Sequence, residues 1–435
     1  MPYTFQIKTL GCPVNQHEGR ALAEAMLRAG FTETTGPADI YIINSCAVTR
    51  AAAAEARRLA GRAKKENPGA LTVLAGCYPQ VYWREIADLL PGVDMIVGTA
   101  DRLRLPGLIS RRLSGENTPR IHVTAHHPGE VFEELPQTEH YGRIRPVVKI
   151  QEGCDETCTY CIVRTARGLP RSLAPEKVLA RVRALLARGY REIILAGTHL
   201  GTYGREWPGW NLARIIREIC SLPDRFRLRL DYLEPMDVTD ELLETLAASP
   251  KVCPFLYLPL QSGADRILEK MGRRYTAEDY IRLVEKARRL LPDPAVWTDL
   301  IAGFPGETAE DHRRTVSLVR ELALSRLHVF PYSPRPGTAA AAFPDQVAPD
   351  VKKDRVRELR ALGEELHLAY CRRFIGREAA VLVEKAAGGT AFGHCAHYLG
   401  VSFPAAEPDL RGSLVSVKIL AARPGGVAGI MLNPL

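Results

Sequence analysis

Three cysteines lie within eight positions of the sequence, in "GCDETCTYC": Cys154, Cys158 and Cys161. Thiolates at this spacing could bind zinc, form a disulfide or hold an iron–sulfur cluster. Structural zinc takes four ligands, usually as two pairs. The next cysteine, Cys220, falls in a predicted helix, so only His199 or His328 could complete a zinc site. Three thiolates on one loop without a fourth suit a [4Fe–4S] cluster whose fourth iron stays open to bind another molecule.

A second set of cysteines follows three predicted strands, "TFQIKTL", "DIYIINS" and "ALTVLAG": Cys12, Cys46 and Cys77. In an open α/β sheet the carboxyl ends of parallel strands share one edge, and ligands bind there. These thiols can therefore converge although they are far apart in sequence. The alternative is that they are unrelated core residues. The remaining cysteines are predicted to be structural: Cys220, Cys253, Cys371 and Cys395.

Composition limits the cellular setting and the partners. The chain has 435 residues, enough for two or three domains, and it is 46% hydrophobic and 25% charged. No apolar run could span a bilayer, and the N-terminus lacks the pattern of a secretory leader. We therefore expect a cytoplasmic protein without a membrane partner, in which thiols stay reduced. The formal net charge of +8 fits a polyanion such as nucleic acid.

The elements that would position the cysteines fall into three blocks. Residues 1–110 alternate strands and helices, which predicts a Rossmann-like parallel sheet. After a connector at 111–140, residues 141–350 repeat a strand–helix unit six times, which predicts a (β/α)6 partial barrel with its site at the C-terminal strand ends. A linker helix at 351–373 leads to five short strands at 374–435, which predict a small OB-like β-barrel.

The first cysteine loop resembles a known signature. CxxxCxxC with an aromatic residue, Tyr160, before the last cysteine is similar to the motif of radical S-adenosylmethionine (SAM) enzymes. The resemblance implies that the open iron binds the amino and carboxylate groups of SAM. An electron from the cluster then splits the sulfonium and yields a 5′-deoxyadenosyl radical. Such a cofactor is needed because side-chain acids and bases cannot functionalise an inert C–H bond.

The resemblance extends over almost the whole chain, to the methylthiotransferase family. "TLGCPVNQHE", "INSCAVT" and "LAGCYPQ" resemble its N-terminal cluster motifs, "LPLQSGADRILEKMGRRYT" and "FPYSPRPGTAAA" its barrel motifs, and the last block its RNA-binding TRAM domain. It implies a second [4Fe–4S] cluster on Cys12, Cys46 and Cys77 that carries sulfide or persulfide sulfur. One SAM methylates this sulfur, and the radical from a second SAM activates the substrate carbon that takes the methylthio group. A reductant such as flavodoxin or ferredoxin is implied.

The family has three branches, which act on N6-isopentenyladenosine in tRNA, on N6-threonylcarbamoyladenosine in tRNA and on an aspartate of a small-subunit ribosomal protein. "NSCAVTRAAAAEARR" and "LAGTHLGTYG" resemble the threonylcarbamoyladenosine branch. We therefore expect a methylthio group to be added at C2 of that nucleoside, next to the anticodon, where the loop presents an unstacked base. The alternatives are the other two substrates and, in another class, an RNA-binding iron–sulfur redox sensor.

The resemblance also implies residues around SAM, while no side chain is assigned as a catalytic acid or base. The expected cofactor-binding residues are Tyr160, Gly197, Thr198, Glu234, Gln261, Ser262, Asp299 and Ile301. Arg273 and Arg274 are expected either to contact RNA phosphates or to lie at a solvated helix end.

Five residues depart from the family pattern, and we expect them to line the barrel mouth and to affect substrate identity: Arg164, Thr165, Leu173, Phe255 and Tyr257.

Overall fold

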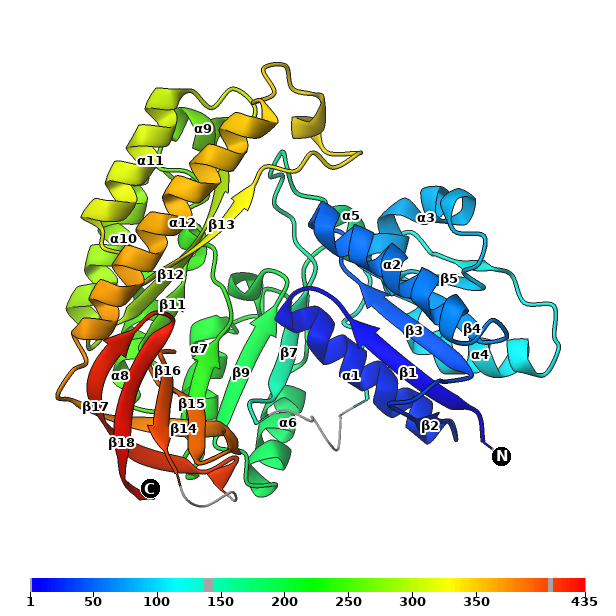
Figure 1. Ribbon diagram of the computed structural model, residues 1–435, viewed down its shortest axis with the longest axis horizontal. Coiled ribbons are helices and arrows are strands. Elements are labelled where there is room, and N and C mark those ends of the chain that lie inside the picture. Colours follow the sequence, from blue (N-terminus) through cyan, green and yellow to red (C-terminus); the bar gives the residue numbers. More distant parts are fainter. Residues whose placement is uncertain (1, 137–143, 406–409, 435) are drawn as a thin grey trace.

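The chain folds into three parts that follow one another along the sequence (Figure 1). The computed structural model describes residues 2–136, 144–405 and 410–434. A parallel sheet comes first, a partial barrel with outer helices comes second, and a small closed barrel ends the chain. Within the described ranges, none of the helices combines the length and the apolar character that a membrane span requires.

The N-terminal part is a six-stranded parallel sheet in the order β2-β1-β3-β4-β5-β6. Its strands are β1 (Thr4–Thr9), β2 (Thr32–Glu33), β3 (Ile40–Ser45), β4 (Leu71–Gly76), β5 (Met95–Val97) and β6 (Ile121–His122). Its helices are α1 (Pro13–Arg28), α2 (Arg50–Glu66), α3 (Cys77–Leu89) and α4 (Leu105–Leu113), with a 3-10 turn η1 (Thr99–Arg104) before α4. β6 lies in the segment that the sequence suggested as a connector.

Alternating strand residues place two apolar layers on this sheet. Ile40 and Ile42 of β3 pack with α1 and α4 on one face, while Tyr41 and Ile43 pack with α2 and α3 on the other. Successive strand side chains point to opposite faces, so a continuous apolar strand needs helices on both sides. The Rossmann-like prediction is confirmed.

The central part contains all six predicted barrel strands. They are β7 (Val147–Glu152), β9 (Glu192–Gly197), β10 (Arg227–Leu230), β11 (Phe255–Tyr257), β12 (Ala295–Ala302) and β13 (Arg326–Pro331). β8 (Arg171–Ser172) pairs antiparallel with β7 and was not predicted. The strands form two sheets, β10-β9-β7-β8 and β11-β12-β13, which a parallel bridge between Leu228 and Val252 connects.

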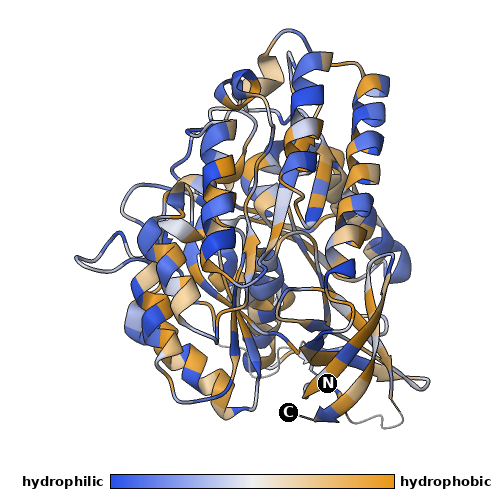
Figure 2. Cartoon of the chain, turned by 90° about the vertical axis from the view of Figure 1, so that its left-hand side faces the viewer, coloured by the Kyte–Doolittle hydropathy of each residue, from blue (hydrophilic) through white to orange (hydrophobic). Residues whose placement is uncertain are grey.

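Outer helices cover this partial barrel (Figures 1 and 2). They are α6 (Pro175–Ala187), α7 (Leu212–Cys220), α8 (Asp240–Ala248), α9 (Asp265–Lys270), α10 (Ala277–Leu290) and α11 (Ala309–Glu321). The short helix α5 (Val163–Arg167) instead packs against the N-terminal sheet. Figure 2 shows blue and orange residues alternating along the helices, the pattern of elements with one buried face. Capping boxes at Thr276–Asp279 and Thr308–Asp311 start α10 and α11.

Helix α12 (Pro349–Arg372) leads to the terminal part. Its strands are β14 (Glu378–Ala387), β15 (Thr390–Cys395), β16 (Gly400–Pro404), β17 (Leu414–Arg423) and β18 (Gly426–Pro434), and they close in the order β14-β15-β16-β18-β17. The predicted five-stranded barrel is therefore confirmed.

The terminal barrel packs against the N-terminal ends of the central strands. Tyr398 stacks on Trp297 with ring centroids 4.8 Å apart, and Phe255 meets Tyr398 edge-on at 5.0 Å. Phe255 is the first residue of β11 and pairs with Ala295, the first residue of β12. The expectation that Phe255 lines the barrel mouth is wrong, because the mouth lies at the opposite ends of these strands.

Five buried charged residues join the N-terminal sheet to the central barrel. Glu18 and Arg102 come from the first part, and Lys149, Glu152 and Arg167 come from the second; each is at most 3% exposed. Arg102, Lys149 and Arg167 lie 2.7, 2.8 and 2.9 Å from Glu152 carboxylate oxygens. Burial disfavours the charge on Glu18, but Arg102, Arg167 and Lys149 hold its pKa well below the usual range. We call these five residues the seam network.

Candidate functional site

The three cysteines of the first part lie at one edge of the sheet, after three adjacent parallel strands. Cys12 is the N-cap of α1, Cys46 follows β3, and Cys77 opens α3 after β4. Gly11 has φ +105°, and a Cβ there would lie 2.7 Å from the Cys46 Cβ, so close approach requires glycine. We call Cys12, Cys46 and Cys77 the N-terminal trio.

The other three cysteines lie on the loop after β7, and we call Cys154, Cys158 and Cys161 the barrel trio. Gly153 has φ +82°, and a Cβ there would meet the Leu169 carbonyl oxygen at 1.9 Å. The Thr159 amide donates to the Met271 carbonyl at 2.9 Å, and its hydroxyl donates to the Lys270 carbonyl at 2.8 Å. Glycine and these anchors shape the loop around its thiols.

The two trios border the same interior. Ala47, Cys77, Ile162 and Ala166 form one apolar cluster, so the residues that follow Cys46 and Cys161 pack together. From the barrel side, the Arg167 Nε donates to the Cys77 Sγ at 3.1 Å. The trios therefore face each other where the sheet meets the barrel.

The chemistry of both trios fits a bound metal cluster. All ten cysteines are free of disulfides. Burial raises the pKa of Cys77 to about 11, although the Arg167 cation opposes this rise. Burial and the neighbouring Cys158 raise the pKa of Cys161 to about 12. Thiols so reluctant to ionise are poor nucleophiles, whereas a metal deprotonates its thiol ligands. Three grouped thiols of this kind suit a metal better than a nucleophilic role.

The first half of the predicted SAM set lies beside the barrel trio. The Tyr160 ring meets Phe304 edge-on at 6.3 Å. Gly197 ends β9, and a Cβ there would approach the Gln151 side chain to 2.9 Å. The Thr198 carbonyl accepts a hydrogen bond from the Tyr232 hydroxyl.

The second half of that set comes from the loop after β11 and from β12. Gln261 has φ +65°, and its amide donates to the Asp299 carbonyl at 2.8 Å while its carbonyl accepts from the Ile301 amide at 3.0 Å. The Asp299 carboxylate accepts from the Tyr257 hydroxyl at 2.5 Å. Ser262 is fully buried and its hydroxyl lies 3.5 Å from that of Thr315. Ser262 is therefore partnered by α11, while Asp299 and Ile301 share one face of β12.

Glu234 and Arg273 form an ion pair beside the barrel trio. Arg273 is 7% exposed, and its Nη1 donates to the Cys158 Sγ at 3.3 Å. Both expectations for Arg273, an RNA phosphate contact and a solvated helix end, are therefore wrong. Arg274 is exposed and pairs with Glu156. Arg273 lies inside because it directly follows Met271 and Gly272, which turn the chain back under the cysteine loop.

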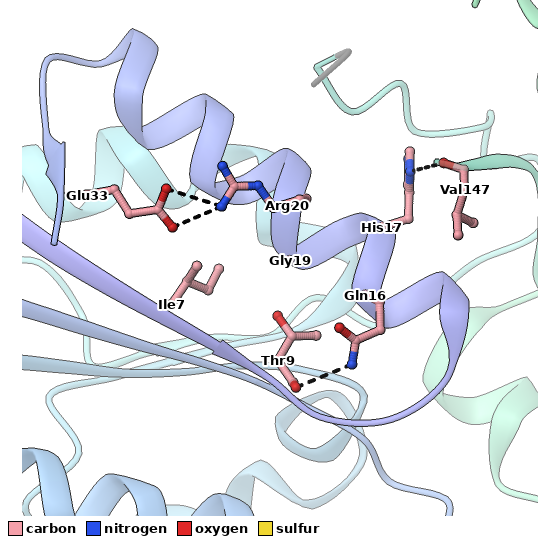
Figure 3. A pocket seen from close by; sticks show the side chains of 8 residues that line it. All are labelled: Ile7, Thr9, Gln16, His17, Gly19, Arg20, Glu33 and Val147. Atoms are coloured by element: carbon pink, nitrogen blue, oxygen red, sulfur yellow. Dashed lines mark hydrogen bonds and ion pairs between the residues drawn. The ribbon is translucent and has the colours of Figure 1, made fainter. Parts of the chain in front are cut away.

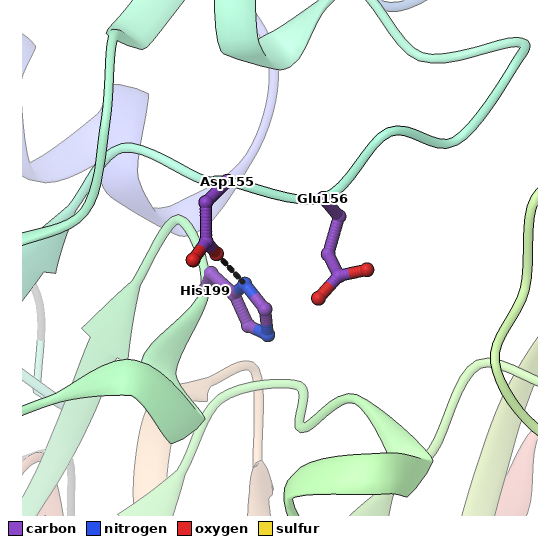
Figure 4. A group of neighbouring side chains, drawn as sticks. All are labelled: Asp155, Glu156 and His199. Atoms are coloured by element: carbon purple, nitrogen blue, oxygen red, sulfur yellow. Dashed lines mark ion pairs between the residues drawn. The ribbon is translucent and has the colours of Figure 1, made fainter.

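His199 lies beside the barrel trio, whereas His328 does not. The His199 Nδ1 is 3.4 Å from the Cys154 Sγ, and its Nε2 is 2.5 Å from the Asp237 carboxylate. Figure 4 shows His199 next to Asp155 and Glu156 of the cysteine loop. His328 instead hydrogen bonds with Tyr257 at 2.6 Å. Of the two histidines considered as zinc ligands, only His199 is near enough.

Two of the residues that depart from the family pattern lie outside the interior. Arg164 and Thr165 of α5 line a cavity of about 600 Å³ together with Trp83 and Arg84 of α3, with Val123 and with residues 125–128. A second cavity, of about 200 Å³, lies between α1, β1 and the start of β7, and the Arg20–Glu33 ion pair borders it (Figure 3). No cysteine of either trio lines these two cavities.

Asp231, which the sequence did not single out, is a half-buried residue after β10. Its Oδ2 has no hydrogen-bond partner among the described residues. Burial raises the pKa of Asp231 to about 7, and the Asp299 carboxylate adds to the rise. A carboxyl group with a raised folded pKa stabilises the fold below its unfolded pKa, near 4, and this contribution is lost as the pH rises through about 7.

We therefore expect Asp231→Asn to change the melting temperature in a pH-dependent way. Near pH 4 the wild-type side chain is neutral in the folded state and largely protonated in the unfolded state, so the two melting temperatures should differ least there, and the advantage of the variant should grow as the pH rises toward 7. Above pH 7 the variant should melt higher, because it avoids burying a charge. Thermal scans across this range check the prediction, and a difference that stays constant with pH would contradict it.

Arg167 connects the barrel to the N-terminal trio through its contact with Cys77, and sequence reasoning missed it. Arg167 stands six residues after Cys161 in "CIVRTARG", where it reads as one more cation of a basic chain. The only available signal was its place on the segment that directly follows the cysteine loop. Burial of a charged side chain is decided by distant partners, here Glu18 and Asn15.

Comparison with known proteins identifies the family. Residues 148–319 match the Radical SAM superfamily, and residues 4–98 match the Uncharacterized protein family UPF0004. The chain is 38% identical to the threonylcarbamoyladenosine tRNA methylthiotransferase MtaB of Bacillus subtilis, over 96% of this chain and 94% of that protein. It is 35% identical to a tRNA-2-methylthio-N(6)-dimethylallyladenosine synthase of Pelotomaculum thermopropionicum, over 98% and 97%.

A solved structure agrees at the level of the fold. The radical SAM methyltransferase TsrM of Kitasatospora setae has 16% identity and a TM-score of 0.59, and the match covers 78% of this chain and 77% of that one. Membership of the radical SAM superfamily implies SAM and [4Fe–4S] clusters, which overrules the zinc and disulfide alternatives for the barrel trio. With relatives of this identity over nearly its full length, the chain belongs to the radical SAM tRNA methylthiotransferase family.

Proposed function

We propose that this enzyme adds a methylthio group to C2 of N6-threonylcarbamoyladenosine, at the position 3′-adjacent to the anticodon of tRNA. The observation that carries the proposal is the 38% identity, over 96% of the chain, to a relative named for this substrate. A second relative of that name, from Thermotoga maritima, is 37% identical over 88% of the chain. The opposed cysteine trios supply the two metal sites that sulfur insertion needs.

In this proposal each trio holds one [4Fe–4S] cluster, and the barrel cluster binds SAM. The bound cofactors supply a radical at one site and the transferred sulfur at the other. The protein positions these groups: Tyr160, Gly197 and Thr198 border SAM on one side, and Glu234, Gln261, Ser262, Asp299 and Ile301 complete its site. Ala47, Ile162 and Ala166 exclude water between the trios, which protects a radical from side reactions.

The terminal barrel and the positive charge of the chain suit tRNA as the partner. Five-stranded barrels of this kind often bind oligonucleotides, and the formal net charge of +8 attracts a phosphate backbone. We propose that the anticodon stem-loop enters between the sheet and the barrel, in the cytoplasm. Flavodoxin or ferredoxin would supply electrons.

A second candidate substrate is N6-isopentenyladenosine. Relatives named tRNA-2-methylthio-N(6)-dimethylallyladenosine synthase are 35–37% identical over at least 97% of the chain. The two groups of relatives differ by only a few per cent in their identity to this chain, so the experiment has to distinguish the two nucleosides directly.

The test is mass spectrometry of nucleosides from tRNA of a host that lacks its own methylthiotransferases and expresses this chain. The methylthio derivative of N6-threonylcarbamoyladenosine should appear, and it should be missing with Cys158→Ala. If only the isopentenyladenosine derivative appears, the second candidate replaces the first. If neither appears although both clusters are loaded, a ribosomal protein becomes the substrate to test.

A further inference from the structure

We infer that Arg167 and Arg273 are positioning residues that separately set the reduction potentials of the two clusters, Arg167 for the N-terminal trio and Arg273 for the barrel trio. The inference rests on the proposed assignment of one cluster to each trio. It adds a division of labour that the family resemblance does not contain: each trio has a buried arginine of its own, with a guanidinium N–H directed at one cysteine sulfur.

Arg167 is held from every side while it contacts Cys77. It is 3% exposed, and its Nε donates to the Cys77 Sγ at 3.1 Å. Its Nη1 donates to Glu18 at 2.5 Å and to Glu152 at 2.9 Å, and its Nη2 donates to Asn15. The planar fork therefore cannot rotate away from the sulfur without breaking several buried hydrogen bonds.

Arg273 has the equivalent arrangement at the other trio. Its Nη1 donates to the Cys158 Sγ at 3.3 Å, its Nε donates to the Tyr275 hydroxyl at 3.1 Å, and its Nη2 pairs with Glu234. The guanidinium also lies over the Tyr275 ring at 5.0 Å. Here again, a carboxylate and a hydroxyl orient the cation toward one thiolate.

A hydrogen bond and a nearby cation both withdraw electron density from a ligating sulfur. They stabilise the reduced cluster, which carries one more electron, and thereby raise its reduction potential. Arg167 pairs with the Glu18 and Glu152 carboxylates, which offset part of its charge at a distance. The direct N–H···S contact is then the part of its influence that is specific to the N-terminal cluster.

The two arginines act on different trios. In the part of the chain that the structure describes, Arg167 hydrogen bonds to a sulfur of the N-terminal trio only and Arg273 to a sulfur of the barrel trio only. Arg167 itself belongs to the barrel, on α5. The surroundings of the N-terminal cluster are thus complete only when the sheet is docked on the barrel.

The experiment is an anaerobic redox titration of the full-length reconstituted enzyme, followed by electron paramagnetic resonance. Each cluster takes up one electron from a dithionite-poised mediator mixture. Each paramagnetic resonance signal is assigned with variants in which the three cysteines of one trio are replaced by alanine, so that only the other cluster contributes to the spectrum. Arg167→Lys should lower the potential of the N-terminal cluster by about 59 mV, a tenfold change for one electron, and leave the barrel cluster unchanged. Arg273→Lys should do the reverse.

Arg102→Lys is the matched control, because Arg102 is equally buried in the seam network but contacts no cysteine sulfur among the described residues. It should leave both potentials in place. The inference is overturned if Arg167→Lys retains its iron and its potential, if Arg102→Lys lowers the potential as much, or if either arginine shifts both clusters.

A second pair of variants tests the same inference if a lysine variant does not bind its cluster. Asn15→Ala and Tyr275→Phe each remove a neutral hydrogen-bond partner of Arg167 or Arg273 and keep every charge, and each should lower only its own cluster's potential, by less. No shift in either would also overturn the inference. These readouts need no tRNA, so a wrong substrate assignment would show in the nucleoside experiment and not here.

Discussion

Replacing Cys12, Cys46 and Cys77 together by alanine should abolish methylthio transfer to tRNA while the protein still cleaves SAM to 5′-deoxyadenosine. The N-terminal trio and the barrel trio are separate groups of cysteines on separate elements. Loss of the first leaves the barrel loop and its anchors at Thr159 intact. The variant should therefore contain about four irons instead of about eight.

The matched control replaces Cys154, Cys158 and Cys161 by alanine. It should also keep about four irons, but it should form no 5′-deoxyadenosine and no methylthio nucleoside. Iron analysis, chromatography of 5′-deoxyadenosine and mass spectrometry of tRNA nucleosides measure the three outcomes. The proposal that each trio holds a cluster would be refuted if the N-terminal variant still transferred the methylthio group. It would also be refuted if the unaltered enzyme held only about four irons.

Glu152→Ala should be among the most destabilising single substitutions in this chain. Glu152 is fully buried and lies within 2.7–2.9 Å of Arg102, Lys149 and Arg167. Removing one partner from a buried ionic group leaves uncompensated charge and typically costs about 3–5 kcal/mol. Since these cations come from both parts, the loss should loosen the docking of the sheet on the barrel.

Urea and thermal unfolding of the apo and cluster-loaded proteins measure this effect. Glu55→Ala is the control, because Glu55 forms an exposed ion pair with Arg58 on α2, and such pairs contribute little. We expect the control to unfold like the unaltered protein. Equal midpoints for Glu152→Ala and the unaltered protein would show that the seam network does not contribute to stability.

Much of the fold could be predicted because its information is local. Apolar runs such as "DIYIINS" and "AVWTDLIAG" could only be buried strands, and their alternation with amphipathic helices requires a parallel sheet. The short strands β6 and β8 were not predicted, because each has two residues, too few to show a periodic pattern. Their pairing depends on neighbours that the local sequence does not specify.

The site divides in the same way. The six cysteines could be found because each stands at a strand end or in a spaced motif, and strand ends of one parallel sheet share an edge. Phe255 was misplaced because a motif match does not show which end of a strand packs on the terminal barrel. Arg273 was misread as an RNA contact because a sequence gives a cation its charge but not its surroundings.

The sequence by itself therefore determined which residues can ligate iron and which element carries each of them, since spacing and hydrophobic periodicity are properties of a single segment. The tertiary structure alone decided that the two trios face each other, that Arg167 spans from α5 to Cys77, and that the pKa of Asp231 is raised. These features arise between segments distant along the chain, where packing and desolvation act on residues that no local pattern connects.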